Sequence, residues 1–144
     1  MECSLQWTDT YHENTLCITN NISQRDGGSH LAGFRGALTR SIVSYINKNV
    51  KNKINVTGDD AREGLTSVIS VKLADPKFSS QSKDKLVSSE VRPVVESVSL
   101  DKLEQWMEEN PSEIKKVIDK VVEASDAREA ARKARELTRR KTGL

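Results

Sequence analysis

A chain of 144 residues is long enough for one domain with a single hydrophobic core. Hydrophobic residues make up 35% of it, aromatic residues 4% and charged residues 31%, which predicts a small aliphatic core under a large solvated surface. No apolar run approaches the roughly 18 residues of a membrane-spanning helix, so we expect no contact with a membrane. Two cysteines without metal-like spacing or a secretory signal are typical of a reduced, cytoplasmic protein.

The net charge of +2 conceals an uneven distribution. Residues 128–141 hold seven Lys and Arg against two Glu, a local charge of +5, so the rest of the chain sums to −3. A basic terminal segment beside a near-neutral body points to an anionic partner. The alternative is a solvated helix face, which composition alone favours.

The first twenty residues predict two strands. Apolar and polar residues alternate with a period of two over residues 3–11, as in a half-buried strand, and residues 15–20 have a similar pattern. The simplest arrangement is an antiparallel hairpin that turns at residues 12–14. Because the first strand begins directly after Met1, we expect the chain to be cut from a longer protein.

A helix follows a glycine pair. Gly27 and Gly28 break the strand pattern, and Ser29 is placed to cap a helix whose apolar stripe runs over residues 31–46. His30 suits packing or capping at this helix start better than catalysis, because no nucleophile is placed beside it.

The middle of the chain predicts a short helical turn and a strand. Asp59 and Asp60 are placed to cap the turn, which Gly64 ends, and residues 65–73 form the strand. With Glu63, the two aspartates have the chemistry of a metal site, but their spacing fits capping equally well and we favour that role.

An unpaired polar loop carries Gln81 and Lys83 and leads into a predicted helix over residues 84–97, disturbed at Pro93. Ser99 is placed to cap a shorter helix that follows. A lysine and an amide beside helix-start N–H groups suit a phosphate, although lysines in polar loops are usually only solvated.

The last predicted helix runs from Pro111 to about Lys141. Asn110 is placed to cap it, Pro111 is its first residue, and Glu113 completes a capping box. The order of elements predicts an α+β fold, a mixed sheet with helices on one face, followed by a long protruding C-terminal helix. We divide the chain into an α+β domain, residues 1–110, and this basic helix, residues 111–144.

Four blocks, in order, resemble the transducer domain of the B subunit of bacterial DNA gyrase, an ATP-hydrolysing type II topoisomerase. They are residues 20–35, 57–65, 77–91 and 127–135. The resemblance covers nearly the whole chain. It implies the fold shared with a small-subunit ribosomal protein and a domain of elongation factor G, with a third sheet strand at residues 53–57.

The resemblance also implies roles for three residues. Lys83 and Gln81 match the family's Gln-Thr-Lys motif, with Ser82 in place of threonine, whose lysine and glutamine bind the γ-phosphate of ATP held by the neighbouring ATPase domain. Arg35 matches the arginine of a Gly-Phe-Arg sequence that lines the cavity through which DNA passes between two B subunits. Its contacts there are expected with phosphates.

The implied partners are DNA, the ATPase and DNA-cleavage domains of the same subunit, and the gyrase A subunit, in an assembly of two A and two B subunits. ATP would be bound mainly by the preceding domain, and Mg²⁺ would have no ligands in this fragment. The chain would therefore couple ATP hydrolysis to strand passage and negative supercoiling, but would be inactive alone.

Three alternatives remain open. The equivalent domain of topoisomerase IV, a decatenase, has the same layout, although Gln24-Arg25-Asp26 is more similar to gyrase. A free-standing nucleic-acid-binding protein would use the basic helix and leave Lys83 idle. A purely structural α+β module would explain the element order but not the four blocks.

Overall fold

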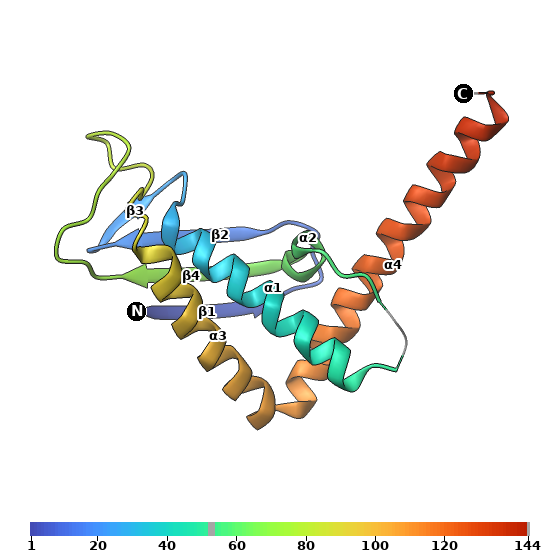
Figure 1. Ribbon diagram of the computed structural model, residues 1–144, viewed down its shortest axis with the longest axis horizontal. Helices are drawn as coiled ribbons and strands as arrows, with labels where there is room; N and C mark the ends of the chain where they lie inside the picture. The colour runs from blue at the N-terminus through green and yellow to red at the C-terminus, as the bar shows by residue number, and fades with distance from the viewer. Residues whose placement is uncertain (52–53, 144) are drawn as a thin grey trace.

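A computed structural model describes residues 1–51 and 54–143 and confirms the α+β class (Figure 1). Its elements, in chain order, are β1 Glu2–Trp7, β2 Asn14–Thr19, β3 Ile22–Gln24, α1 Ser29–Asn49, α2 Gly58–Arg62, β4 Leu65–Val71, α3 Val91–Glu109 and α4 Pro111–Lys141. The strands form one mixed sheet, α1 and α3 lie side by side across one of its faces, and the end of α4 projects away from the body.

The predicted hairpin between the first two strands is wrong. The sheet order is β1-β4-β2-β3, so β4 lies between β1 and β2, antiparallel to the first and parallel to the second. Leu65 and Ile69 of β4 are fully buried, and the most apolar strand takes a central place. Alternation specifies which face of a strand is buried, not which strand it pairs with.

The third strand lies elsewhere than expected. β3 pairs antiparallel with β2 through a two-residue turn at Asn20 and Asn21, whose φ angles are 51° and 67°, as this tight hairpin turn requires. Residues 54–57 form no strand, which contradicts the strand implied at residues 53–57, and Lys53 lies outside the described residues.

Helix α1 carries the predicted apolar stripe into the core. Phe34, Leu38 and Ile42 are each at most 1% exposed. Its cap differs from the prediction, because Gly28 is the N-cap and the hydroxyl of Ser29 donates instead to the carbonyl of Leu86 at 3.2 Å. That bond ties the start of α1 to a distant loop.

Helix α3 is one helix where two were predicted. Residues 84–90 are not helical, and α3 runs unbroken past Ser99, which is buried within it rather than capping it. Pro93 lies in the first turn, where its missing N–H has no intrahelical partner to lose, so the proline does not interrupt the helix.

Helix α4 starts at Pro111, as predicted, and extends over 31 residues to Lys141. The predicted capping box is absent, since the amide of Asn110 donates to the carbonyl of Trp106 instead. The first half of α4 contributes Ile114 and Val121 to the core, whereas residues 130–143 are exposed throughout. The division of the chain at residue 110 stays a prediction.

Candidate phosphate-contact loop

The loop that carries Gln81 and Lys83 connects β4 to α3 and projects beyond the end of the sheet (Figure 1). Both side chains are exposed at its tip. The structure thus presents the two predicted phosphate-binding residues together, away from the hydrophobic core.

The two limbs of this loop are joined to each other below the tip. Phe78 and Leu86 form an antiparallel bridge, and the backbone N–H of Ser79 donates to the carbonyl of Lys85 at 3.0 Å. Lower down, the N–H of Val87 donates to the carbonyl of Lys77 at 2.8 Å. Leu86 is 1% exposed and anchors the loop in the core. An exposed tip therefore stands on a hydrogen-bonded, buried base.

Lys83 has the electrostatic freedom that an anion site needs. Within the described residues it forms no ion pair, and its Nζ lies 5.7 Å from the centroid of the Phe78 ring. The neighbouring carboxylate of Asp84 is already engaged, accepting from the hydroxyl of Ser82 at 2.8 Å and from Arg25 at 3.4 Å. Asp84, the acid that follows Lys83 in sequence, is therefore bonded to Ser82 and Arg25.

The expected help from a helix terminus is absent. Because α3 begins only at Val91, its first N–H groups do not lie beside Lys83 in the chain. Instead, Lys83 has a φ of 60°, and its N–H donates to the carbonyl of Ser80 at 3.1 Å, closing a tight turn. A phosphate would be held by side chains of the tip and not by a helix.

Arg35, in the second turn of α1, lies in an ion-pair network. Its guanidinium contacts the carboxylate of Glu13 at 3.0 Å, and Glu13 is shared with Arg62 at 3.1 Å, which also pairs with Asp59 at 2.8 Å. Sequence inspection missed Glu13, whose place in the turn before β2 gave no sign of these long-range partners. The DNA-facing role of Arg35 stays a prediction.

His30 has the packing role that was expected. It is fully buried, and its Nε2 lies 3.0 Å from the side-chain oxygen of Gln24, which also accepts from the hydroxyl of Thr19 at 2.8 Å. Since an amide oxygen only accepts, Nε2 carries the proton, and Nδ1 has no partner in the described part of the chain. Burial lowers the pKa of His30 to about 4.

Asp59 and Asp60, of the three carboxylates at residues 59–63, have structural partners. The predicted caps are wrong in position, since Thr57 is the N-cap of α2, Asp60 closes a capping box with it from the third helical residue, and Asp59 pairs with Arg62 instead. Asp60 is also paired with Arg128 of α4 at 3.3 Å. Over residues 1–51 and 54–143, no group of three or more His, Cys, Asp or Glu side chains is arranged to hold a metal ion. Nor is any helix of that part of the chain long and apolar enough to cross a membrane.

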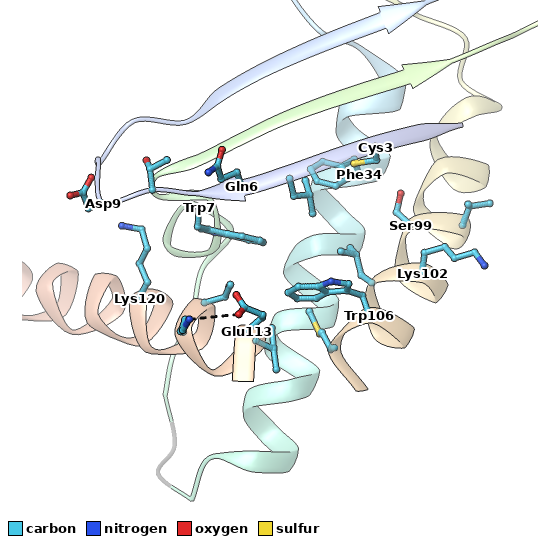
Figure 2. Close-up of a pocket in the computed structure, with 18 of the residues that line it drawn as sticks. Cys3, Gln6, Trp7, Asp9, Phe34, Ser99, Lys102, Trp106, Glu113 and Lys120 are labelled. Atoms are coloured by element: carbon cyan, nitrogen blue, oxygen red, sulfur yellow. Dashed lines mark ion pairs between the residues drawn. The ribbon is translucent and has the colours of Figure 1, made fainter. Parts of the chain in front are cut away.

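A separate cavity of about 990 Å³ lies between β1, α3 and the first half of α4 (Figure 2). Trp7, Phe34 and Trp106 are among its lining residues, with Lys102 and Lys120 nearer its rim. None of the three predicted site residues lines it. The candidate loop and this cavity are therefore distinct features of the molecule.

Comparison of the chain with known proteins points to one family. A family model for DNA gyrase B matches residues 1–137. Over its whole length the chain is 60% identical to the DNA gyrase B protein of Rickettsia prowazekii and 59% identical to that of Caulobacter vibrioides. It spans 18% of each of these curated relatives.

Solved structures agree with the sequence comparison. The 43K ATPase domain of Thermus thermophilus gyrase B, in complex with an aminocoumarin, superposes with a TM-score of 0.85 and 40% identity, covering 94% of this chain and 37% of that one. The topoisomerase IV ATP-binding domain of Francisella tularensis gives a TM-score of 0.78 and 29% identity, covering 88% and 35%. The chain corresponds to about a third of each ATPase-region structure.

Proposed function

Because the chain belongs to the DNA gyrase B family, we propose that it is the transducer segment of a gyrase B protein, lying within the region that the matched structures describe as an ATPase domain. The order of the four sequence blocks supports this subdivision, as does the fact that about two thirds of each matched structure lies outside the chain. The fold shared with the ribosomal protein and with elongation factor G is part of the same proposal.

In this proposal Lys83 and Gln81 contact the γ-phosphate of ATP bound by the rest of the ATPase region, with Mg²⁺ held there too. The supporting observation is the ammonium of Lys83, unpaired within the described residues, at the tip of a loop whose base is buried. The ammonium donates to a phosphate oxygen and the amide of Gln81 adds a neutral donor. A charge-assisted contact of this kind is worth roughly 1.5–3 kcal/mol.

The contact couples chemistry to movement. It exists only while the γ-phosphate is attached, so it holds the loop against the nucleotide before hydrolysis and releases it afterwards. The loop is joined to the sheet and, through Leu86, to the core that contains the first half of α4. Through this path the whole cytoplasmic enzyme, two B and two A subunits, would link ATP hydrolysis to DNA strand passage and negative supercoiling.

The test is ATP hydrolysis and supercoiling by the full-length gyrase B protein assembled with its gyrase A partner, with Lys83→Ala compared with Lys85→Ala. Lys85 is exposed on the same loop and serves as the matched control. We expect K83A to bind nucleotide but to turn over roughly 10- to 100-fold more slowly, the rate equivalent of the lost contact, while K85A keeps its activity. Equal activity of K83A and the unmodified enzyme would remove the central residue of the proposal.

Arg35 has a second, smaller place in the proposal. Of its side chain, 39% is exposed although Glu13 holds the guanidinium, so a phosphate of passing DNA can share it. Decatenation by a topoisomerase IV protein is the alternative activity, and the 29% identity to the Francisella structure against 40% to the Thermus gyrase favours gyrase. Assaying supercoiling and decatenation side by side separates the two.

A further inference from the structure

The loop that carries Gln81 and Lys83, residues 77–87, is here called the phosphate-contact loop. The turn between β3 and α1, residues 25–29, runs beside its second limb, residues 84–87. The N–H of Asp26 donates to the carbonyl of Asp84 at 2.7 Å, and the N–H of Leu86 donates to the carbonyl of Gly27 at 3.0 Å. The N–H of Ser29 returns a bond of 3.0 Å to the carbonyl of Leu86. Residues 25–29, here called the bracing turn, thus hold the loop by backbone bonds directly below its tip.

Gly28 is the point of closest approach. It forms a parallel bridge with Leu86, and a Cβ atom built on Gly28 would lie 2.2 Å from the carbonyl oxygen and 2.6 Å from the nitrogen of Leu86. No side chain fits there unless one of the two backbones moves. The glycine therefore sets how closely the loop lies against the start of α1.

A buried, hydrogen-bonded polar cluster flanks the bracing turn. His30 and Gln24 flank it in sequence and are joined at 3.0 Å in the interior, and the amide of Gln24 also donates to the carbonyl of Ile22 at 2.6 Å. Neither side chain is more than 3% exposed. The bracing turn is therefore held at both of its ends by the buried Gln24–His30 pair, and its backbone bonds to the phosphate-contact loop.

We infer that the bracing turn is the positioning element for Lys83, and that Gly28 is the residue on which the placement of the loop tip depends. The inference rests on the proposed function, since it assigns Gly28 an effect on ATP turnover that is exerted through Lys83. Since the bracing turn leads into α1, the inference also implies that a displacement of the loop is transmitted to the start of this helix, which carries Arg35.

Gly27 offers a matched control for Gly28. Both have positive φ, 70° and 140°, so alanine strains the backbone at either position. A Cβ on Gly27, however, would lie nearest to the flexible Leu31 side chain, whose Cδ2 is at 2.7 Å and whose Cβ is at 3.5 Å. Gly28→Ala therefore crowds the backbone of the loop at Leu86, whereas Gly27→Ala places its Cβ against Leu31 of α1 and keeps the carbonyl that accepts from Leu86.

Hydrogen exchange of the full-length gyrase B protein, followed by mass spectrometry of peptides covering residues 77–87, measures the placement directly. We expect exchange in these peptides to rise about tenfold in G28A and to stay within about twofold in G27A. With the gyrase A partner, we expect G28A to lower kcat for ATP about tenfold with little change in KM, because misplacing a contacting group by about 1 Å costs up to two orders of magnitude.

A second pair of variants guards against a G28A protein that does not fold. Ser29 is the first residue of α1, where proline is tolerated, so Ser29→Pro deletes both of its bonds to Leu86 while Ser29→Ala deletes only that of the hydroxyl. We expect S29P to loosen the loop and S29A to resemble the unmodified protein. Wild-type exchange over residues 77–87 in S29P, or in a folded G28A, would overturn the inference.

The double variant separates the inference from the proposed function. If Gly28 acts through Lys83, adding G28A to K83A lowers turnover no further than K83A alone. Full activity of K83A would refute the proposed function and leave the exchange result to decide whether the turn places the loop. A defective K83A beside an active, normally exchanging G28A would refute the inference alone.

Discussion

The phosphate-contact loop and the outer half of α4 are both exposed, both basic and both project from the body, yet they are held in opposite ways. The loop returns to the core through Leu86 and is bonded across its limbs and to the bracing turn. Residues 130–143 of α4 are exposed, and the ion pairs there lie within the helix. Contacts with distant parts of the chain fix the position of the loop. The position of the outer half of α4 is fixed only by its continuity with the inner half of the same helix.

The largest expected effect tests the anchor of the loop. Leu86→Ala removes a side chain that is 1% exposed, and we expect it to lower the free energy of unfolding by about 3 kcal/mol, through lost burial and the cavity left behind. Chemical denaturation measures it. The neighbouring Val87, which is 45% exposed, is the control, and V87A should change stability by less than about 0.5 kcal/mol. Equal effects would mean that the loop is not anchored by Leu86.

The second effect concerns the cluster below the bracing turn. The pKa of His30 is about 4 in the folded chain, below the ordinary value of 6.5, because burial disfavours the charged ring. Between these pH values the unfolded chain binds more protons than the folded chain. The contribution of the neutral His30 ring to the free energy of unfolding is therefore complete above pH 6.5 and is lost as pH falls towards 4. From pH 7 to pH 5 we expect a loss of about 2 kcal/mol.

Denaturation curves at both pH values test this titration. His30→Gln should lose the part of the pH dependence that comes from this ring, whereas His12→Gln, at an exposed position, should retain it. The same pH dependence in H30Q and the unmodified chain would show that other groups are responsible.

The smallest effect locates the point where α4 leaves the body. Arg128 pairs with Asp60, which is 5% exposed, and donates to the carbonyl of Asn55 at 2.8 Å. We expect Arg128→Ala to cost about 1–2 kcal/mol, since it leaves a buried carboxylate with fewer donors.

Arg132 provides the comparison one turn further along. Its partners Glu129 and Glu136 lie on the same helix and are 32% and 54% exposed, so Arg132→Ala should cost less than about 0.5 kcal/mol, and less still in high salt. If both substitutions lowered the free energy of unfolding equally in denaturation experiments, the inner and outer halves of α4 would not differ in how they are held.

Local signals in the sequence predicted some elements well. Pro111 marks the start of α4 because its missing N–H is harmless only in the first turn. The short helical turn at residues 58–62 was also predicted, although Thr57 and not an aspartate is its N-cap. The exposure of Gln81 and Lys83 followed from the polar loop around them.

Pairing between distant segments was not predictable in the same way. Nothing in β1 or β2 indicates that β4 inserts between them. The helix predicted over residues 84–97 is wrong in its first half, because residues 84–90 are not helical and the burial of Leu86 and Ser88 around an exposed Val87 is the alternation of an extended chain. The bracing turn was missed because its bonds join backbone groups far apart in sequence.

The unbroken path of α4 past Arg128 has a mechanical consequence. At 1.5 Å per residue, the stretch from Arg128 to Lys141 acts as a lever arm of about 20 Å, so a tilt of about 10° where it leaves the body carries its end through roughly 3–4 Å. A rearrangement of side chains around Asp60 and Arg128 would then become a displacement comparable to the spacing of neighbouring residues along a chain. Such an amplification requires that the outer half of α4 stays helical and that the inner half stays packed in the core.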